Sequence, residues 1–257
     1  DKKYIFSAQG AKDSLIINWD QEVLRMLEGE VRSGITKFSV LGNPGDNSVY
    51  LEDGSLFWNN GIDKKKIIDV KEIKLRGKHN VGNILAAIGA TLAVGVKIPD
   101  IKKAVSNFSG IPHRLEWVRE FQGVNYFNDT AATTPESASG GIESFDEPVI
   151  LIAGGSDKNL DFSILAEVIS RKPQKTILLR GEASDKILEE LKKIGREKIS
   201  GLNYLLASSM EEAVSMAKSL AKSGDVILLS PGAASFGMFK NEFDRGDKFK
   251  EAVNGLK

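Results

Sequence analysis

The chain of 257 residues contains no cysteine. This absence excludes disulfide bonds, thiolate metal sites and a cysteine nucleophile, and it is compatible with a reducing compartment. Histidine is also scarce, with two residues, His79 and His113. Because a lone histidine is more often structural than catalytic, residue type alone gives neither of them a role in chemistry.

Neither sign of charge is in excess, and no apolar run is long. Lys and Arg together number 35, as do Asp and Glu, so the formal net charge is zero. This balance predicts no general attraction to nucleic acid or to an anionic membrane, and any anion site must be built locally. The longest apolar stretch, residues 84–96, is too short and too rich in Gly and Ala to span a bilayer. The start Asp1-Lys2-Lys3-Tyr4 has no initiator methionine and no signal peptide, and we expect a piece of a longer protein.

The first part of the chain has mixed periodicity. Apolar spacing predicts strands over residues 13–18 and 37–41, a helix over 19–29, short strands and turns over 42–69, and helices over 80–94 and 100–107. A Gly/Pro break follows at Ser109-Gly110-Ile111-Pro112. We place a domain boundary there, which gives domains 1–110 and 111–257.

Beyond the break the pattern is regular. A hairpin is predicted from residues 115–121 and 125–128, followed by apolar strands over 149–153, 175–179, 204–206 and 226–230, each leading into a helix. Continuously apolar strands that alternate with helices predict an α/β fold with a mostly parallel, Rossmann-like sheet covered on both faces. The carboxyl ends of such strands share one edge, where ligands bind in the loops.

Two loops at this expected edge contain small residues beside a polar group. After the strand at 149–153 comes Gly-Gly-Ser-Asp-Lys-Asn, which puts Lys158 at the edge, although a solvated turn lysine explains it equally well. After the last strand comes Ser-Pro-Gly-Ala-Ala-Ser-Phe, with Ser235 beside Phe236. The simpler interpretation there is a tight turn with Phe236 in the core. The polar run at 240–247 predicts an internally paired network.

A third loop, Asn-Asp-Thr-Ala-Ala-Thr-Thr-Pro at 128–135, lies between a strand and a helix. Thr134 before Pro135 is an ordinary helix N-cap. Capping does not account for Asp129, a carboxylate that suits a Mg²⁺–nucleotide site or a ribose contact.

Both histidines lie in distinctive strings. Lys-His-Asn-Val-Gly-Asn opens a predicted helix, and its Asn80 and Asn83 share one face and can pair with an adenine. Pro-His-Arg-Leu-Glu lies at the proposed domain junction, where Arg114 is suited to a phosphate.

Five strings in this order resemble the muramyl ligases of peptidoglycan synthesis, and most closely the member that adds D-glutamate. They are GKHNVGN (77–83), SGIPHRLE (109–116), NDTAATTP (128–135), GGSDKNLDF (154–162) and LLSPGAASFGMFKNEFDRGDKF (228–249). The resemblance implies an ATP- and Mg²⁺-dependent ligase that joins D-glutamate to UDP-N-acetylmuramoyl-L-alanine through an acyl phosphate. A cytoplasmic monomer is expected, without nucleic-acid or membrane partners.

The resemblance also implies roles for regions and residues. Residues 1–110 correspond to the end of a central ATP-binding domain, and residues 111–257 to a C-terminal domain that binds D-glutamate and nucleotide. The implied nucleotide contacts are Asn80, Asn83, His113, Arg114 and Asp129. The implied D-glutamate pocket contains Thr133, Lys158, Ser235 and Phe236. Lys2 corresponds to a carbamylated lysine that helps hold Mg²⁺ during catalysis.

The sequence departs from the family pattern at several points. The Gly-rich phosphate loop ending in Gly-Lys-Ser/Thr is absent, so we expect this chain alone to be inactive. Ala131 replaces a lysine of the family, and Glu242 replaces a phenylalanine, with Phe243 next to it. The alternatives are another muramyl ligase, a folylpolyglutamate synthase-like ligase, or a nucleotide-binding module without catalysis.

Overall fold

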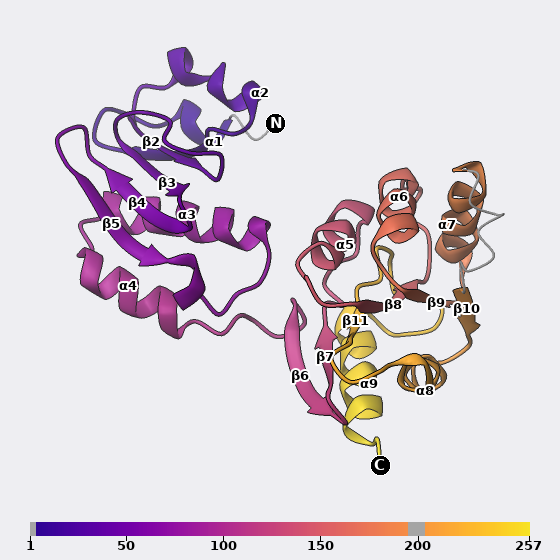
Figure 1. The fold of residues 1–257 in the computed structure, drawn as a ribbon. Coiled ribbons are helices and arrows are strands. Elements are labelled where there is room, and N and C mark those ends of the chain that lie inside the picture. The colour runs from indigo at the N-terminus through magenta and orange to yellow at the C-terminus, as the bar shows by residue number, and fades with distance from the viewer. Residues whose placement is uncertain (1–3, 195–203) are drawn as a thin grey trace. The chain divides into compact units, whose positions relative to one another are not determined.

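A computed structural model describes residues 4–194 and 204–257 of the chain. The chain divides into two compact units, 1–109 and 110–257, each with its own sheet (Figure 1). The division falls one residue before the boundary expected from the Gly/Pro break.

The first unit is built on a five-stranded mixed sheet in the order β1-β2-β3-β4-β5. Its strands are β1 (Ser14–Asn18), β2 (Gly34–Ser39), β3 (Ser48–Glu52), β4 (Ser55–Asn59) and β5 (Lys64–Asp69). The pairs β1–β2 and β2–β3 are parallel, whereas β3, β4 and β5 form an antiparallel meander. Its helices are α1 (Tyr4–Ser7), α2 (Glu22–Arg25), α3 (Lys78–Ala93) and α4 (Ile98–Asn107).

The helix predicted over 19–29 was too long. The structure has the four-residue α2 and then a 3₁₀ turn at Glu28–Glu30. Neither element buries a residue, and Val23 within α2 is exposed. Most helical stability in proteins comes from packing of an apolar face. Because this segment packs no such face, a longer helix is not stabilised here.

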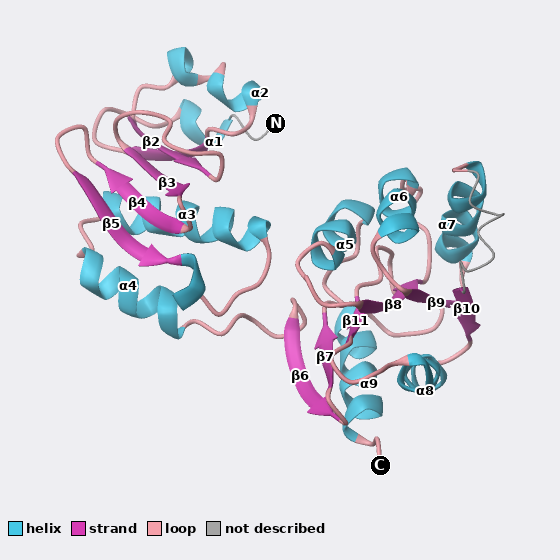
Figure 2. Ribbon diagram, viewed as in Figure 1, coloured by secondary structure: helices cyan, strands magenta, loops and turns pink. Residues whose placement is uncertain are grey.

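Helix α3 forms the core of the first unit with the sheet. Leu85 and Ile88 pack with Val49, Leu56 and Ile68. Gly89 allows the close approach, because a Cβ there would lie 3.3 Å from the Cγ2 atoms of both Ile16 and Thr36. The Gly/Ala-rich composition of α3 therefore reflects tight packing on β1 and β2 (Figure 2).

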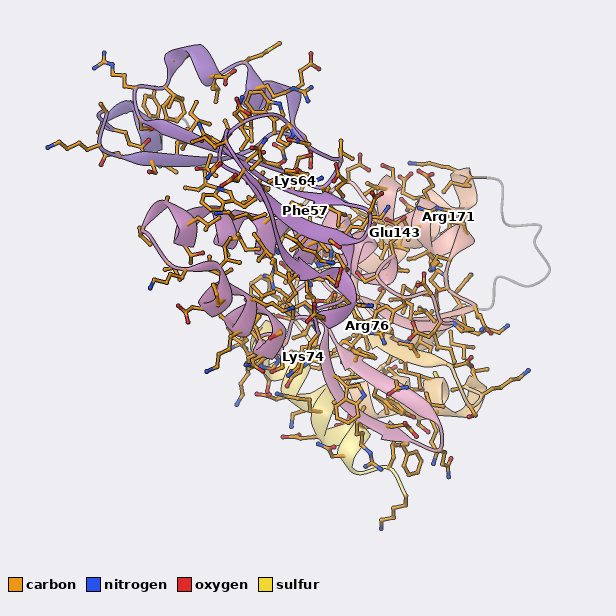
Figure 3. The ribbon with its side chains drawn as sticks, turned by 60° about the vertical axis from the view of Figure 1, so that its left-hand side comes forward. Phe57, Lys64, Lys74, Arg76, Glu143 and Arg171 are labelled. Atoms are coloured by element: carbon orange, nitrogen blue, oxygen red, sulfur yellow. The ribbon has the colours of Figure 1, made fainter. Side chains whose placement is uncertain are left out.

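A lysine of strand β5 contacts an aromatic ring of β4 and a carboxylate of β3. The Lys64 ammonium lies 4.3 Å from the centroid of the Phe57 ring (Figure 3) and also pairs with Glu52. Strand β5 is at the edge of the sheet, and its lysines disfavour pairing with another chain.

The second unit has a six-stranded sheet in the order β10-β9-β8-β11-β7-β6. Its strands are β6 (Glu116–Phe121), β7 (Val124–Asn128), β8 (Val149–Gly154), β9 (Lys175–Leu179), β10 (Tyr204–Ala207) and β11 (Val226–Leu229). All neighbours are parallel except the β6–β7 hairpin. Its helices are α5 (Pro135–Ile142), α6 (Ser163–Arg171), α7 (Glu182–Lys193), α8 (Met210–Leu220) and α9 (Glu242–Asn254). The mostly parallel α/β sheet predicted from the sequence is confirmed.

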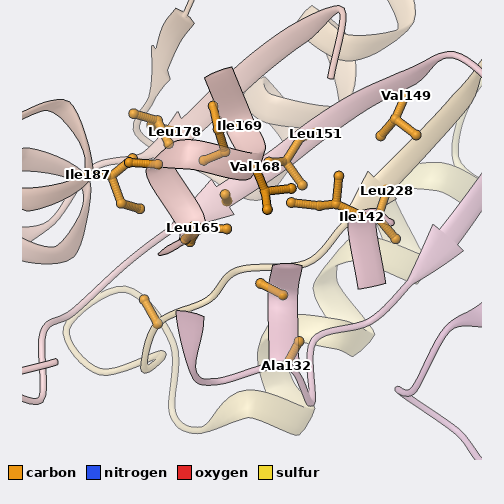
Figure 4. Close-up of a cluster of buried hydrophobic side chains, with 14 of the residues drawn as sticks. Ala132, Ile142, Val149, Leu151, Leu165, Val168, Ile169, Leu178, Ile187 and Leu228 are labelled. Atoms are coloured by element: carbon orange, nitrogen blue, oxygen red, sulfur yellow. The ribbon is translucent and has the colours of Figure 1, made fainter. Parts of the chain in front are cut away.

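Helices cover both faces of this sheet. Helices α5, α6 and α7 lie on one face, and α8 and α9 on the other (Figure 1). The first face buries Leu151, Leu165 and Leu228 in one apolar cluster (Figure 4). The opposite face buries a second cluster that includes Ile227 and Phe249. Every residue of the central strand β8 is buried, as its uninterrupted apolar sequence predicts.

The surface of the second unit carries an ion pair between Arg171 of α6 and Glu143, which follows α5 (Figure 3). Among the residues that the structure describes, no helix combines the length and apolar character needed to cross a membrane.

Candidate functional site

Three loops meet at the carboxyl edge of the second sheet, and we call them the loop cluster: residues 129–134 after β7, 155–161 after β8 and 230–241 after β11. The Gly232 N–H donates to the Ala132 carbonyl at 2.9 Å, and the Gly154 N–H donates to the Pro231 carbonyl at 2.8 Å. Ser156 and Ala234 exchange backbone hydrogen bonds of 3.0 and 3.1 Å as an antiparallel bridge. Backbone pairing therefore fixes the three loops against one another.

Arg245, at the start of α9, fills the interior of the loop cluster. Its side chain is fully buried, and burial lowers its pKa to about 10 while Glu242 acts in the opposite direction. The guanidinium donates to the Thr130 Oγ1 at 2.9 Å, to the Thr130 carbonyl at 3.0 Å and to the Ala233 carbonyl at 3.1 Å. One buried cation thus joins two loops to α9.

Asp129 is buried where β7 ends. Its Oδ2 accepts from the Ser230 hydroxyl at 2.8 Å and its Oδ1 accepts from the Leu115 N–H at 3.1 Å. Burial raises the pKa of the Asp129 carboxyl to about 7, against the opposing effects of these hydrogen bonds and of the Arg114 charge. Helix α5 closes over this carboxylate, because a Cβ at Gly141 would lie 2.5 Å from Oδ2.

The ring and the backbone of His113 both have polar partners within the second unit. The Asn128 Oδ1 accepts from the Thr130 N–H, so its Nδ2 faces the His113 Nδ1 at 3.1 Å. The Nδ1 therefore accepts, which leaves the ring proton on Nε2, 3.7 Å from the Asp247 Oδ1. The backbone N–H of His113 donates to Glu116, and its carbonyl accepts from the Ala131 N–H.

Arg114 follows His113 and is exposed. Both of its neighbours have left-handed backbone, with φ of 68° at His113 and 45° at Leu115. Such conformations cost energy in residues other than glycine and occur often at functional sites. The buried His113 and Asp129 fix this turn, and the turn presents Arg114 outward.

Lys158 and Phe236 come together at the rim of the loop cluster, and Ser235 is buried just before Phe236. The Lys158 Nζ lies 5.1 Å from the centroid of the Phe236 ring. Ser235 is 3% exposed, whereas Phe236 is 56% exposed. The interpretation of Phe236 as a core residue is therefore wrong: Pro231–Ser235 are buried, and the ring that follows them turns outward.

Thr133 and Thr134 have different environments in the loop 129–134. Thr134 caps α5, since its side chain accepts from the Ser137 N–H, which confirms its predicted capping role. Thr133 is partly buried, and its N–H donates to the Ala131 carbonyl at 3.0 Å. Ala131, which replaces a cation of the family pattern, brings no charge to this loop.

The remaining predicted residues lie elsewhere. In the first unit, Asn80 and Asn83 share a face of α3, and the Asn83 Nδ2 donates to the Asn80 Oδ1 at 3.3 Å. Asn80 also donates to the Arg76 carbonyl and is buried, while Asn83 is exposed. Lys2 lies outside the described residues. In residues 4–194 and 204–257, no group of three or more His, Asp or Glu side chains could hold a metal ion.

Sequence reasoning missed Arg245 as an individual residue. The polar run 240–247 predicted an internal network, and the structure confirms one, in which Asn241 caps α9 by accepting from the Asp244 N–H. The pattern did not indicate that a charged residue inside this run is fully buried.

The folds of both units match those of solved Mur ligases. UDP-N-acetylmuramate-alanine ligase from Thermotoga maritima superposes with a TM-score of 0.64 at 17% identity, covering 95% of this chain and 52% of that one. MurF ligase from Thermotoga maritima, solved in complex with ADP, gives 0.65 at 16% identity over 98% and 56%. Residues 113–232 match the model of the family described as Mur ligase, glutamate ligase domain.

Individual relatives are more similar in sequence. The UDP-N-acetylmuramoylalanine–D-glutamate ligase of Clostridium tetani is 42% identical over 258 residues, which cover 99% of this chain and 54% of the relative. The ligase of the same name from Clostridium perfringens is 40% identical over 255 residues, with the same coverage. The chain thus spans about half the length of the curated relatives it matches, and it is homologous to them over nearly its whole length.

Proposed function

We propose that this chain is part of an ATP-dependent ligase that adds D-glutamate to UDP-N-acetylmuramoyl-L-alanine in peptidoglycan synthesis. The observation that carries the proposal is the homology over 99% of the chain to ligases of this name. The loop cluster supports it, because it gathers a cation, a hydroxyl and an aromatic ring at the sheet edge where ligands bind.

D-Glutamate has two carboxylates and one amine, so its recognition needs cations and hydroxyl groups. We assign its binding to Lys158, Thr133, Ser235 and Phe236. In the described part of the chain, no carboxylate is ion-paired with Lys158. Asp157 beside it is held by Lys186 at 2.6 Å, and this contact lowers the pKa of Asp157. Lys158 is therefore available for a ligand carboxylate.

ATP, when bound, supplies the phosphoryl group that converts the substrate carboxylate to an acyl phosphate. The uncharged amine of D-glutamate then attacks the acyl carbon and the amide bond forms. The bond between the acyl carbon and the bridging oxygen breaks, so inorganic phosphate leaves with that oxygen, and the amine loses a proton to water. Lys158 fixes a carboxylate of the nucleophile and thereby limits the orientations of its amine.

Nucleotide binding is assigned to Asn80 and Asn83 in the first unit and to His113, Arg114 and Asp129 in the second. Exposure favours Arg114 and Asn83 for direct contact, while buried His113 and Asp129 hold the turn that carries Arg114. Magnesium, which the resemblance implies together with Lys2, finds no donor set in the described residues, so no step is assigned to it.

The proposal is tested by Lys158→Ala in the full-length ligase. Loss of the carboxylate contact should raise the KM for D-glutamate about tenfold or more, which corresponds to about 1.4 kcal/mol. The KM for ATP and the melting temperature should change little, because Lys158 is exposed. Lys192→Ala, at an exposed position on α7, serves as the matched control. An unchanged KM for D-glutamate would show that Lys158 is a solvated turn residue that does not bind D-glutamate.

A further inference from the structure

Phe236 is an aromatic side chain whose position is not explained by folding. It follows five buried residues, Pro231–Ser235, yet its own ring is 56% exposed. In residues 4–194 and 204–257, the one ring contact described for it is with the Lys158 ammonium. Exposing a phenyl ring to water is unfavourable, so the cation is the partner that accounts for its placement.

Hydrogen bonds join the two loops that carry these partners. The Ser156–Ala234 bridge lies two residues before Lys158 in one loop and two residues before Phe236 in the other, and it joins the loops by two hydrogen bonds. The Ser156 hydroxyl adds a third bond, to the Phe236 carbonyl itself. The ring and the ammonium are thus carried on one rigid frame, although their side chains are exposed.

Lys158 has few competing attractions. The carboxylate next to it in sequence, Asp157, is occupied by Lys186 and by the Leu160 N–H. A four-carbon lysine side chain without a partner populates many rotamers, and fixing it on binding costs conformational entropy. A cation–π contact reduces this cost in advance while leaving the ammonium open to an anion.

We propose that Phe236 is a positioning residue that holds the Lys158 ammonium over its ring and presents it to a carboxylate of D-glutamate. The identity of the ligand rests on the proposed function, whereas the contact does not. A protein carboxylate at this place would neutralise the Lys158 ammonium. The ring holds the ammonium and leaves its charge available to a ligand. Phe236 therefore acts through Lys158. The role requires an aromatic ring, and an apolar side chain of similar size cannot replace it.

The contact is tested first by NMR on this 257-residue chain with ¹³C-labelled lysine. The ε-CH₂ signal of Lys158, assigned by its loss in Lys158→Arg, should lie upfield of other exposed lysines because of the ring current. Phe236→Leu should abolish the upfield shift, and Phe236→Trp should retain it. Phe243→Leu is the control, since Phe243 is 55% exposed but packs against His113. A Lys158 signal unaffected by Phe236→Leu would overturn the proposal.

The role is tested by kinetics of the full-length ligase. Phe236→Leu should raise the KM for D-glutamate roughly two- to fivefold with kcat and the KM for ATP unchanged, and Phe236→Trp should restore it. An unchanged KM for D-glutamate in Phe236→Leu, when Lys158→Ala raises it, would overturn the positioning role. If Lys158→Ala leaves the KM for D-glutamate unchanged, and the wild-type Lys158 signal shows the ring-current shift, then the contact between Lys158 and Phe236 exists but the proposed function fails.

Discussion

The two units of this chain differ in what they bury. In the first, α3 packs on the sheet around one apolar cluster, and the buried polar side chains among its described residues are four serines and Asn80. In the second, helices on both faces of the sheet enclose two clusters, and the buried side chains include Asp129, Asp225 and Arg245. All of the buried Asp and Arg side chains described in residues 4–194 and 204–257 are therefore in the second unit.

Large apolar side chains are more exposed in the first unit than in the second. Ile62 and Leu41 in the first unit are 91% and 80% exposed, whereas among the described residues of the second unit the most exposed large apolar side chains reach 56%. Helix starts differ as well: side chains cap α5, α8 and α9 in the second unit, although not α6 or α7, whereas none caps α2, α3 or α4 in the first. The better-enclosed unit is thus the one that can tolerate the cost of burying charge at its loop cluster.

The unfolding of each unit can be measured separately through its tryptophans. Trp19 and Trp58 lie in the first unit, and Trp117 lies in the second. Fluorine-labelled tryptophan gives each unit its own NMR signal during urea unfolding.

The largest effect is expected for Arg245→Met. The variant leaves the buried oxygens of Thr130 and Ala233 without their donors, which should lower the free energy of unfolding of the second unit by about 4–5 kcal/mol. The Trp117 transition should move to lower urea, and those of Trp19 and Trp58 should not. Arg171→Met, which removes an exposed ion pair, is the control and should cost less than about 1 kcal/mol. Equal effects of the two variants would show that the buried guanidinium is not a structural centre.

Asp129 should make the second unit less stable as the pH rises. Its folded pKa of about 7 lies above the usual value of 3.8, so the folded state binds more protons between these limits. Its contribution to stability is therefore complete below pH 4 and is lost as the pH rises through 7, by up to about 4 kcal/mol. The Trp117 midpoint should fall over this range in the wild type and much less in Asp129→Asn. A midpoint that rises with pH, and does so equally in both proteins, would contradict the buried neutral carboxyl.

Core truncations test whether the units are independent. Leu85→Ala in the first core and Leu151→Ala in the second should each cost about 3 kcal/mol. Each variant should shift the tryptophan signals of its own unit only. If either variant moved all three signals together, the units would unfold as one cooperative body, and the contrast between them would lose its energetic meaning.

The smallest effect is expected at a helix cap. Thr134→Ala removes the acceptor for the Ser137 N–H at the start of α5 and should cost about 1 kcal/mol, seen at Trp117. Lys97→Ala at the uncapped start of α4 should have almost no effect at Trp19 or Trp58. Comparable losses at both positions would mean that capping does not distinguish the units.

Much of the fold could be predicted from local patterns. The strand Val149–Gly154 is continuously apolar, and the structure places it at the centre of a covered sheet. The weakly amphipathic segment 19–29 was predicted incorrectly, because its spacing resembles a helix that lacks a partner surface. The candidate site was predictable to the level of loops: parallel strands must bring their carboxyl ends to one edge, so Asp129, Lys158 and Ser235 had to fall near it.

By itself, the sequence determined the order of strands and helices, the Gly/Pro break near residue 110 and the set of polar residues at the strand ends. These features depend on periodicity and backbone preference within a few residues. Only the tertiary structure decided that Arg245 is buried, that Phe236 is exposed under Lys158, and that Asp129 is held by Ser230. Asp129 and Ser230 are 101 residues apart, and Arg245 and Thr130 are 115 apart. The burial and pairing of these side chains depend on which distant segments meet, and no local pattern carries that information.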